Sequence, residues 1–189
     1  MSNIRIFVSH RIDIDSETVD TPVYFPVRCG AVYDESNSEI QGDDTGDNIS
    51  KLRMSFCEFT VQYWAWKNVD ADYYGLCHYR RYLSFSDKHY KNTVFNMVRE
   101  LRLTAHEKKK YHLDDTKKIN SVVQKYDMII PVVAKASEMS YNRAEVKTLR
   151  EMWESYNGVY FEQGIIDKMF SLIKELSPEY YNSACEYFS

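Results

Sequence analysis

The chain has 189 residues and a formal net charge of −4, from 24 basic and 28 acidic side chains, which suits one domain over residues 1–189 whose core needs no disulfide or metal. The acidic balance argues against a general nucleic-acid-binding protein, because such a protein needs a broad basic surface. No segment contains the roughly 20 apolar residues of a membrane span, and the first residues lack the apolar stretch of a signal peptide.

Cysteine usage points to the cytoplasm. The four cysteines have no metal-ligand spacing, and three of them lie in apolar stretches, so we expect reduced residues of the core. They are Cys29, Cys57, Cys77 and Cys185. We therefore expect a cytoplasmic protein whose contact with a membrane, if it has one, is peripheral and at the inner face.

The N-terminal quarter predicts two extended segments and polar loops. Ile4 to Val8 is a short apolar strand ending in Ser9 and His10. Thr21 to Tyr33 contains two prolines, which predicts an irregular strand or a loop that crosses a site. Glu35 to Asp47 is rich in Asp, Gly, Ser and Asn, which is typical of a solvated loop.

A helix follows this loop, with Asn48 or Ser50 as its cap. Its apolar residues recur at helical spacing, at Leu52, Phe56, Phe59, Tyr63 and Trp66. Three more apolar residues widen this face, namely Cys57, Val61 and Trp64. We therefore expect the helix to be buried on more than one side.

An apolar tract that ends in cationic residues comes next. Tyr73 to Cys77 predicts a buried strand, because aromatic and apolar residues suit a pleated surface. The residues after it are His78, Arg80, Arg81 and Tyr82. In open α/β sheets, ligands bind beyond the carboxyl ends of the strands, so this cluster suits a phosphate or a carboxylate. The alternatives are a structural histidine and arginines that form salt bridges.

Beyond residue 87 the pattern predicts mostly helices. The predicted helices are Lys88–Leu103, Lys117–Gln124, Arg143–Tyr156, Phe161–Leu176 and a last segment after Pro178. Met128 to Val133 predicts a second buried strand. His106 to Tyr111, with its three lysines, predicts a solvated basic loop, and contact with an anionic membrane surface is the alternative.

A second constellation, Asp43 to Ser50, lies at the predicted N-terminus of the helix that follows the loop. Gly46 and Asn48, beside exposed backbone N–H groups, suit a ligand hydroxyl or phosphate. The alternatives are an acidic loop with an ordinary helix cap, or a divalent metal bound by the acidic residues.

Five motifs, in this order, resemble the DUF4422 family. They are FVSHR at 7–11, YFPVRCGA at 24–31, GDNIS at 46–50, CEFTVQYWAWKN at 57–68 and DYYGLCHYRRYL at 72–83. Such domains occur in bacterial capsular polysaccharide, exopolysaccharide and O-antigen gene sets and are regarded as glycosyltransferases, some of which transfer galactofuranose. The resemblance implies an α/β fold with a GT-A-like (Rossmann-like) mixed sheet flanked by helices.

The chain departs from the family pattern in three places. Arg53 or Met54 stands where the family usually has asparagine, and Glu145 stands where it tends to have histidine. The aromatic C-terminal segment of the family is expected to follow where Ser189 ends, so we expect a C-terminally truncated or divergent chain.

The resemblance and the residues together suggest a mechanism. A departing nucleoside diphosphate must have its charge neutralised, and GT-A-like enzymes often use a divalent metal on an Asp-x-Asp motif. The spacings Asp13–Asp15 and Asp70–Asp72 are poorly placed for this, because neither ends a strand. We therefore expect no cofactor, with Mn²⁺ or Mg²⁺ as the alternative, and assign the catalytic charge stabilisation to His78, Arg80 and Arg81.

The remaining site residues follow from the same hypothesis. Asp47 is the expected general base, preferred over Asp72 and over Glu58, which we expect to be buried and bonded to an arginine or tyrosine. The expected substrate-binding residues are His10, Gly46, Asn48, Ser50 and Tyr82. His10, at the end of the first strand, is expected near the nucleotide.

The expected partners are a nucleotide-sugar donor, most simply a UDP-sugar, and a glycan or lipid-linked acceptor of cell-surface polysaccharide synthesis, with no nucleic acid. A rival hypothesis is a non-catalytic scaffold that binds nucleotide sugars or carbohydrate, and a phosphatase or nuclease is a weaker third. Turnover of a nucleotide sugar separates the first two hypotheses, and metal-dependent phosphate release is the mark of the third.

Overall fold

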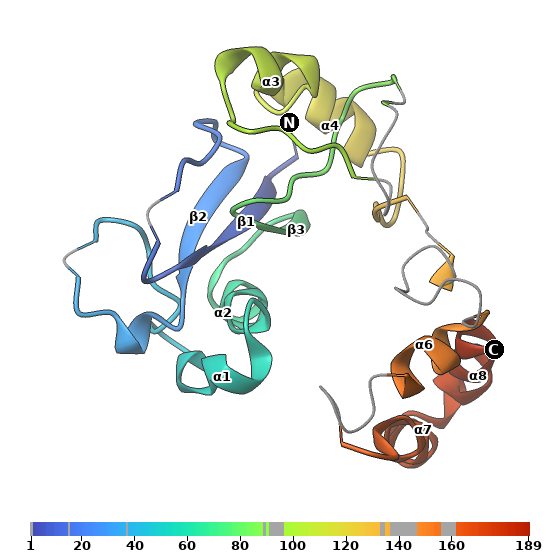
Figure 1. Ribbon diagram of the computed structural model, residues 1–189. Coiled ribbons are helices and arrows are strands. Elements are labelled where there is room, and N and C mark those ends of the chain that lie inside the picture. Colours follow the sequence, from blue (N-terminus) through green and yellow to red (C-terminus); the bar gives the residue numbers. More distant parts are fainter. Residues whose placement is uncertain are drawn as a thin grey trace. The chain divides into compact units, whose positions relative to one another are not determined.

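The computed structural model describes residues 2–14, 16–36, 38–88, 90, 97–132, 135–136, 147–155 and 162–189 (Figure 1). The chain forms two compact units. Unit 1 comprises Met1–His89 and Glu100–Pro131, and unit 2 comprises Tyr90–Arg99 and Val132–Ser189. The expectation of one domain over residues 1–189 stays a prediction. Among the described helices, none has the length and apolar character needed to cross a membrane.

Unit 1 contains an open parallel sheet, so the expected α/β class with a GT-A-like sheet is confirmed. β1 (Ile4–Arg11) lies between β2 (Tyr24–Cys29) and β3 (Tyr73–His78), in the order β2-β1-β3. The strands of a parallel sheet all end on the same side, and we call this side the carboxyl edge. In the register, Arg11 pairs with Cys29 and Ser9 with His78, so the first and third strands bring their polar ends to one place.

Strand β1 continues past the apolar run Ile4–Val8 and through its predicted polar end to Arg11. Ser9, His10 and Arg11 continue the strand because each has a partner in the ladder, although their side chains are polar. β2 tolerates Pro26 because it is an edge strand among the strands described, where one side of the backbone needs no ladder hydrogen bond.

The helical region after the loop is broken, where we predicted one helix. It consists of η2 (Ser50–Leu52), α1 (Arg53–Phe56) and α2 (Phe59–Asn68). The break is at Cys57, whose φ of 46° lies in the left-handed region, which is uncommon for residues other than glycine.

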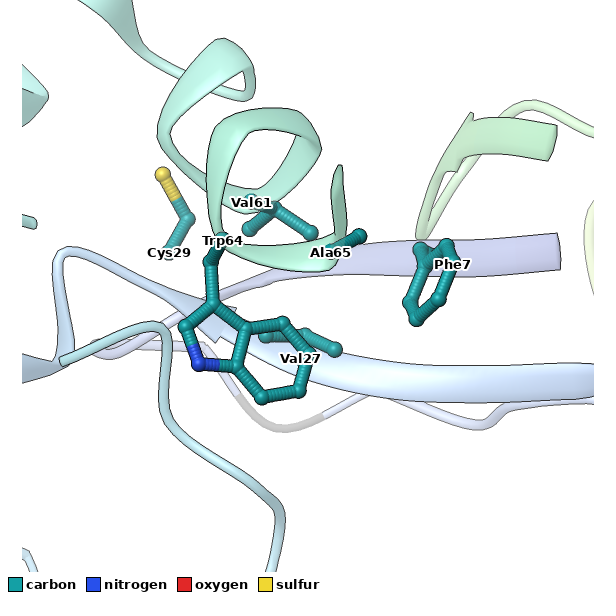
Figure 2. Packing of buried hydrophobic residues seen from close by; sticks show 6 residues of the cluster. All are labelled: Phe7, Val27, Cys29, Val61, Trp64 and Ala65. Carbon is teal, nitrogen blue, oxygen red and sulfur yellow. The ribbon is translucent and has the colours of Figure 1, made fainter. Parts of the chain in front are cut away.

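The main core of unit 1 lies between α2 and the sheet (Figure 2). It consists of Phe7, Val27, Cys29, Val61, Trp64 and Ala65. The ring centroids of Phe7 and Trp64 are 6.3 Å apart, in an edge-to-face arrangement. Burial of one such large side chain contributes about 1.5–3 kcal/mol, so this cluster is a main source of stability for unit 1.

We predicted the wrong face of this helical region as the main buried face. The predicted stripe includes Phe59 and Trp66, which are exposed, whereas Trp64 and Val61 pack on the sheet. Apolar residues surround α2, so spacing alone could not distinguish the two faces. Polar contacts favour the face of Val61 and Trp64, because Thr60 is also buried and its hydroxyl donates to the buried carboxylate of Asp43.

Strand β3 was expected to be buried, but two of its side chains are not. Tyr74 and Leu76 are exposed, because α2 packs on β1 and β2 and does not cover this face of β3. Cys57 is also exposed, in contrast to the expected buried cysteines, whereas Cys29 is buried and Cys77 is half-buried.

The rest of unit 1 contains α3 (Ala105–Lys110) and α4 (Thr116–Val123). Helix α4 was predicted, whereas the segment that forms α3 was expected to be a loop. Thr104 and Glu107 form a capping box that starts α3. This helix was not predicted, because its three lysines are typical of a solvated loop.

Two further predictions fail in the described residues of this region. Residues 97–103 are not helical, and the other described residues of the predicted Lys88–Leu103 helix do not form one. Residues 128–132 do not form the predicted strand, and Met128, Ile130 and Val132 are exposed.

Unit 2 contains α6 (Leu149–Glu154), α7 (Ile165–Leu176), η3 (Pro178–Tyr180) and α8 (Tyr181–Phe188), in agreement with the predicted C-terminal helices. The Phe170 ring packs edge to face on the rings of Tyr181 and Phe188. Residues 143–146, with Glu145, lie outside the described residues.

Candidate active site

His78 ends β3 and lies at the centre of the candidate site. Its Nδ1 accepts a hydrogen bond from the backbone N–H of Arg80, at 3.2 Å. Its carbonyl accepts from the N–H of Arg81, at 2.8 Å, which closes a tight turn directly after the strand. Both arginine side chains are exposed, so the turn presents two guanidinium groups at the carboxyl edge.

The histidine ring contacts an acidic residue from another element. His78 Nε2 lies 3.5 Å from Oε1 of Glu58, the residue that precedes α2. Burial lowers the pKa of His78 below its ordinary value, and the carboxylate of Glu58 opposes this effect. The guanidinium groups of Arg81, Arg80 and Arg11 lower the pKa further, so the ring is neutral near pH 7.

Arg11, the last residue of β1, adds a third exposed cation. Its Nε donates to Oδ1 of Asp13 at 2.8 Å, and this contact lowers the pKa of that carboxyl. Arg53 Nη2 lies 3.9 Å from the same oxygen. The aliphatic part of Arg53 passes Gly30, whose φ of 71° and missing Cβ leave room for it. We call Arg11, Arg53, Arg80 and Arg81 together the cation cluster.

Arg53 was noted above as a departure from the family pattern, and the structure places it in this cluster. Arg11 was not predicted as a site residue. Its position at the end of the strand next to β3 is the signal that could have identified it, because parallel strands end side by side.

Glu58 differs from its predicted environment. The sequence predicted a buried carboxylate bonded to an arginine or tyrosine, but the side chain is 42% exposed and its Oε1 lies 3.5 Å from Nε2 of His78. The apolar neighbours Cys57 and Phe59 suggested burial, yet both of them are exposed as well.

Asp47, the predicted base, lies at the other end of α2. Its backbone N–H donates to Oδ1 of Asn68, the last residue of that helix, at 3.1 Å. Its carboxylate accepts from the Tyr63 hydroxyl at 3.1 Å and lies 4.0 Å from Nζ of Lys67. Ten helical residues span about 15 Å, so the structure does not bring Asp47 together with His78.

The predicted loop residues near Asp47 form an internal network. The Asn48 amide donates to the carbonyls of Asp44 and Gly46, each at 3.0 Å. Gly46 has a φ of 58°, and a side chain there would overlap Asn68. The loop is thus bonded to the C-terminal end of α2. The role of the loop in binding a substrate stays a prediction.

A buried carboxylate, Asp43, organises the start of this loop, and the sequence did not single it out. It accepts from the N–H groups of Gly30 and Ala31, each at 2.9 Å, and from the hydroxyls of Ser50 and Thr60, each at 2.5 Å. All four donors are groups of the protein itself. Ser50, a predicted substrate-binding residue, is one of them and is fully buried.

His10 and Tyr82 are likewise held by contacts inside unit 1. Side chains alternate along a strand, so His10 points to the opposite face of the sheet from Phe7 and α2. His10 is buried, with Nε2 at 2.6 Å from the Thr18 hydroxyl. The Tyr82 ring packs edge to face on Tyr24, and burial raises the pKa of its hydroxyl.

Comparisons with known proteins agree with this architecture. The family model described as "Domain of unknown function (DUF4422)" matches residues 5–189. The solved apo structure of WbbM, described as a bifunctional glycosyltransferase, is similar to this chain with a TM-score of 0.84 and 28% sequence identity. The similarity covers 98% of this chain and 31% of WbbM, so the chain spans about a third of the length of that protein. No curated protein matches the chain.

Proposed function

The chain belongs to the DUF4422 family, and on this membership and the likeness to WbbM we propose that it is a glycosyltransferase that uses a nucleotide sugar. The proposed donor is a UDP-sugar, with galactofuranose among the sugars considered. The proposed acceptor is a growing cell-surface polysaccharide or a lipid-linked glycan. The proposed location is the cytoplasm, with peripheral contact at the inner face of the membrane.

The cation cluster at the carboxyl edge carries this proposal. Ligands of open α/β sheets bind beyond the carboxyl ends of the strands, where Arg11, Arg80 and Arg81 have exposed side chains. A nucleoside diphosphate that leaves a sugar gathers negative charge on its phosphate oxygens. Guanidinium groups already held in place stabilise that charge, and their planar fork matches two phosphate oxygens at once.

The described residues of the two Asp-x-Asp spacings do not fit a metal site. Asp13 is engaged by Arg11 and Arg53, and Asp72 accepts from the N–H of Asn3 at the opposite edge of the sheet. Within the described ranges, no three His, Cys, Asp or Glu side chains gather so that they could hold a metal ion. We therefore propose that the cations stabilise the diphosphate directly.

A calorimetric titration with UDP, with and without Mn²⁺, tests the proposed site in the wild type and in an Arg80→Ala, Arg81→Ala double variant. Hydrogen bonds to charged groups contribute about 1.5–3 kcal/mol, so we expect the double variant to lose at least about tenfold in UDP affinity. The control is a Lys108→Ala, Lys109→Ala double variant, which removes two neighbouring cations from α3 and is expected to bind UDP like the wild type.

The outcomes separate the hypotheses. Metal-independent binding that is lost in the arginine variant supports the cation cluster as the diphosphate site. A folded wild type that does not bind UDP contradicts it. Binding of UDP together with a failure to release UDP from UDP-galactofuranose or UDP-galactopyranose would favour the non-catalytic scaffold.

A further inference from the structure

We propose that Glu58 is the general base that takes the proton from the acceptor hydroxyl, and that His78 positions it. This inference rests on the glycosyltransferase function proposed above. In the proposed step the acceptor oxygen forms a bond to the anomeric carbon while its proton passes to Glu58. The bond from that carbon to the diphosphate oxygen breaks, and its electron pair leaves with the diphosphate, so the configuration at the anomeric carbon is inverted.

The hydrogen bonds of His78 determine which ring nitrogen carries the proton. Nδ1 accepts the backbone N–H of Arg80 at 3.2 Å, so its lone pair is used and the proton of the neutral ring is on Nε2. Nε2 lies 3.5 Å from Glu58 Oε1. The nitrogen that carries the proton is therefore the one nearest the carboxylate, and this polar contact is the means by which His78 positions Glu58, whose other oxygen stays available to a substrate.

Exposure assigns the two roles. The side chain of Glu58 is 42% exposed and that of His78 is 15% exposed. An acceptor hydroxyl can therefore reach the carboxylate, whereas the ring is a supporting group behind it. This matches the pattern in which a partly buried side chain fixes the geometry of a reactive one.

The backbone beneath Glu58 is held on both sides. The carbonyl of Cys57 accepts from Sγ of Cys29 in β2 at 3.1 Å and from the backbone N–H of Thr60 at 3.1 Å. The carbonyl of Glu58 accepts from the N–H of Val61, also at 3.1 Å. The base is thus placed on the junction between the sheet and α2, a rigid position for a catalytic group.

Glu58 also lies at the edge of the sheet where a single displacement at the anomeric carbon needs a base. Arg11 ends β1, and Arg80 and Arg81 follow β3, so these arginines are at the same edge and are proposed to hold the departing diphosphate. One edge therefore combines an exposed carboxylate for the incoming hydroxyl with cations for the leaving group. Asp47, at the far end of α2, lacks this relation to the cations.

Steady-state release of UDP from UDP-galactofuranose and UDP-galactopyranose tests the inference in Glu58→Gln, with Glu35→Gln as a control for loss of an exposed carboxylate. Loss of a general base costs about 100- to 10,000-fold in rate. We expect a loss of this order in kcat for Glu58→Gln, with the KM of the donor and the affinity for UDP unchanged. Glu58→Asp is expected to recover part of the rate.

The role of His78 has its own test. Glutamine can place an N–H donor near the position of Nε2, whereas leucine cannot. We therefore expect His78→Gln to keep a higher kcat than His78→Leu while both bind UDP with equal affinity. Equal kcat values in the two variants would contradict a positioning role.

Wild-type turnover by Glu58→Gln would overturn the inference and leave the glycosyltransferase function intact. Loss of activity in Asp47→Asn, with an active Glu58→Gln, would move the base to Asp47. A wild type that turns over neither donor would count against the proposed function itself, and the inference would fall with it. Thermal melting of each variant shows whether it is folded.

Discussion

The hydroxyl oxygen of Thr60 lies 2.5 Å from Oδ2 of Asp43, and both side chains are fully buried. This bond joins α2 to the loop that precedes it. The same carboxylate binds Ser50 and the backbone at the end of β2, so one charged group fastens three segments that meet at the candidate site.

Substitution of Asp43 is expected to destabilise unit 1 strongly. Asp43→Asn keeps the shape but presents an NH₂ group to donors, which leaves buried groups without acceptors at a cost of about 2–4 kcal/mol in the free energy of unfolding. Thr60→Val removes one bond and is expected to cost about 1–2 kcal/mol. Urea denaturation followed by circular dichroism measures both values. Asp44→Asn, at an exposed neighbour, is the control, and an equal loss there would contradict the assignment.

Gly30→Ala is expected to destabilise the carboxyl edge for two separable reasons. The φ of 71° strains any residue with a side chain, and the new methyl group would overlap Arg53. Together these cost about 1–3 kcal/mol. A double-mutant cycle with Arg53→Ala separates them, because the double variant removes the overlap with Cγ and Cδ of Arg53, leaves only the 2.9 Å approach to Cβ, and keeps the strain. Strictly additive losses in the cycle would show that the two residues do not interact.

The stability of unit 1 is expected to fall with acid partly through His78. Burial and the guanidinium groups of Arg81, Arg80 and Arg11 lower its pKa in the folded state, against the opposing effect of Glu58. The folded state therefore binds fewer protons than the unfolded state between the lowered pKa and the ordinary value near 6.5. The resulting stability is present above pH 6.5 or so and is lost as the pH falls through the folded-state pKa.

His78→Gln tests this pH dependence. We expect the variant to lose less unfolding free energy than the wild type between about pH 7.5 and pH 5, because it has no ring to protonate. An NMR titration of the ring protons gives the pKa of His78 directly, and a value above that of an unfolded peptide would contradict the expectation.

The two tryptophans of α2 are expected to differ sharply. Trp64 is 5% exposed and lies in the core, whereas Trp66 is 65% exposed. Trp64→Ala is therefore expected to cost about 3–5 kcal/mol in the free energy of unfolding, and Trp66→Ala less than about 1 kcal/mol. The opposite order in urea denaturation would mean that the outer face of α2 is the buried one.

The sequence predicted the parts of the fold that depend on local pattern. Continuous apolar runs identified β1 and β3, and the cationic end of β3 indicated the edge where Arg80 and Arg81 lie. The same reasoning could not distinguish Asp43 from its acidic neighbours, because only the folded chain surrounds one of them with four donors. It could not place Glu58 beside the arginines either, since that depends on which end of α2 meets the strand ends.

Two other failures have a common physical cause, which is that exposure depends on partners far away in the chain. The spacing of Phe59 and Trp66 matches a buried helix face, but the sheet packs on the opposite side of α2. The apolar stretch that includes Met128 and Ile130 suits a strand, but the described residues there have no strand partner.

The direction of α2 has a consequence for how a ligand meets the protein. The helix begins at the carboxyl edge, next to Glu58, so the positive end of its dipole adds to the guanidinium charges there. A chain with a formal net charge of −4 thus has a positive pole on one edge of its sheet. An anionic ligand is drawn toward that pole and repelled elsewhere, so electrostatic steering makes its association rate fall as ionic strength rises.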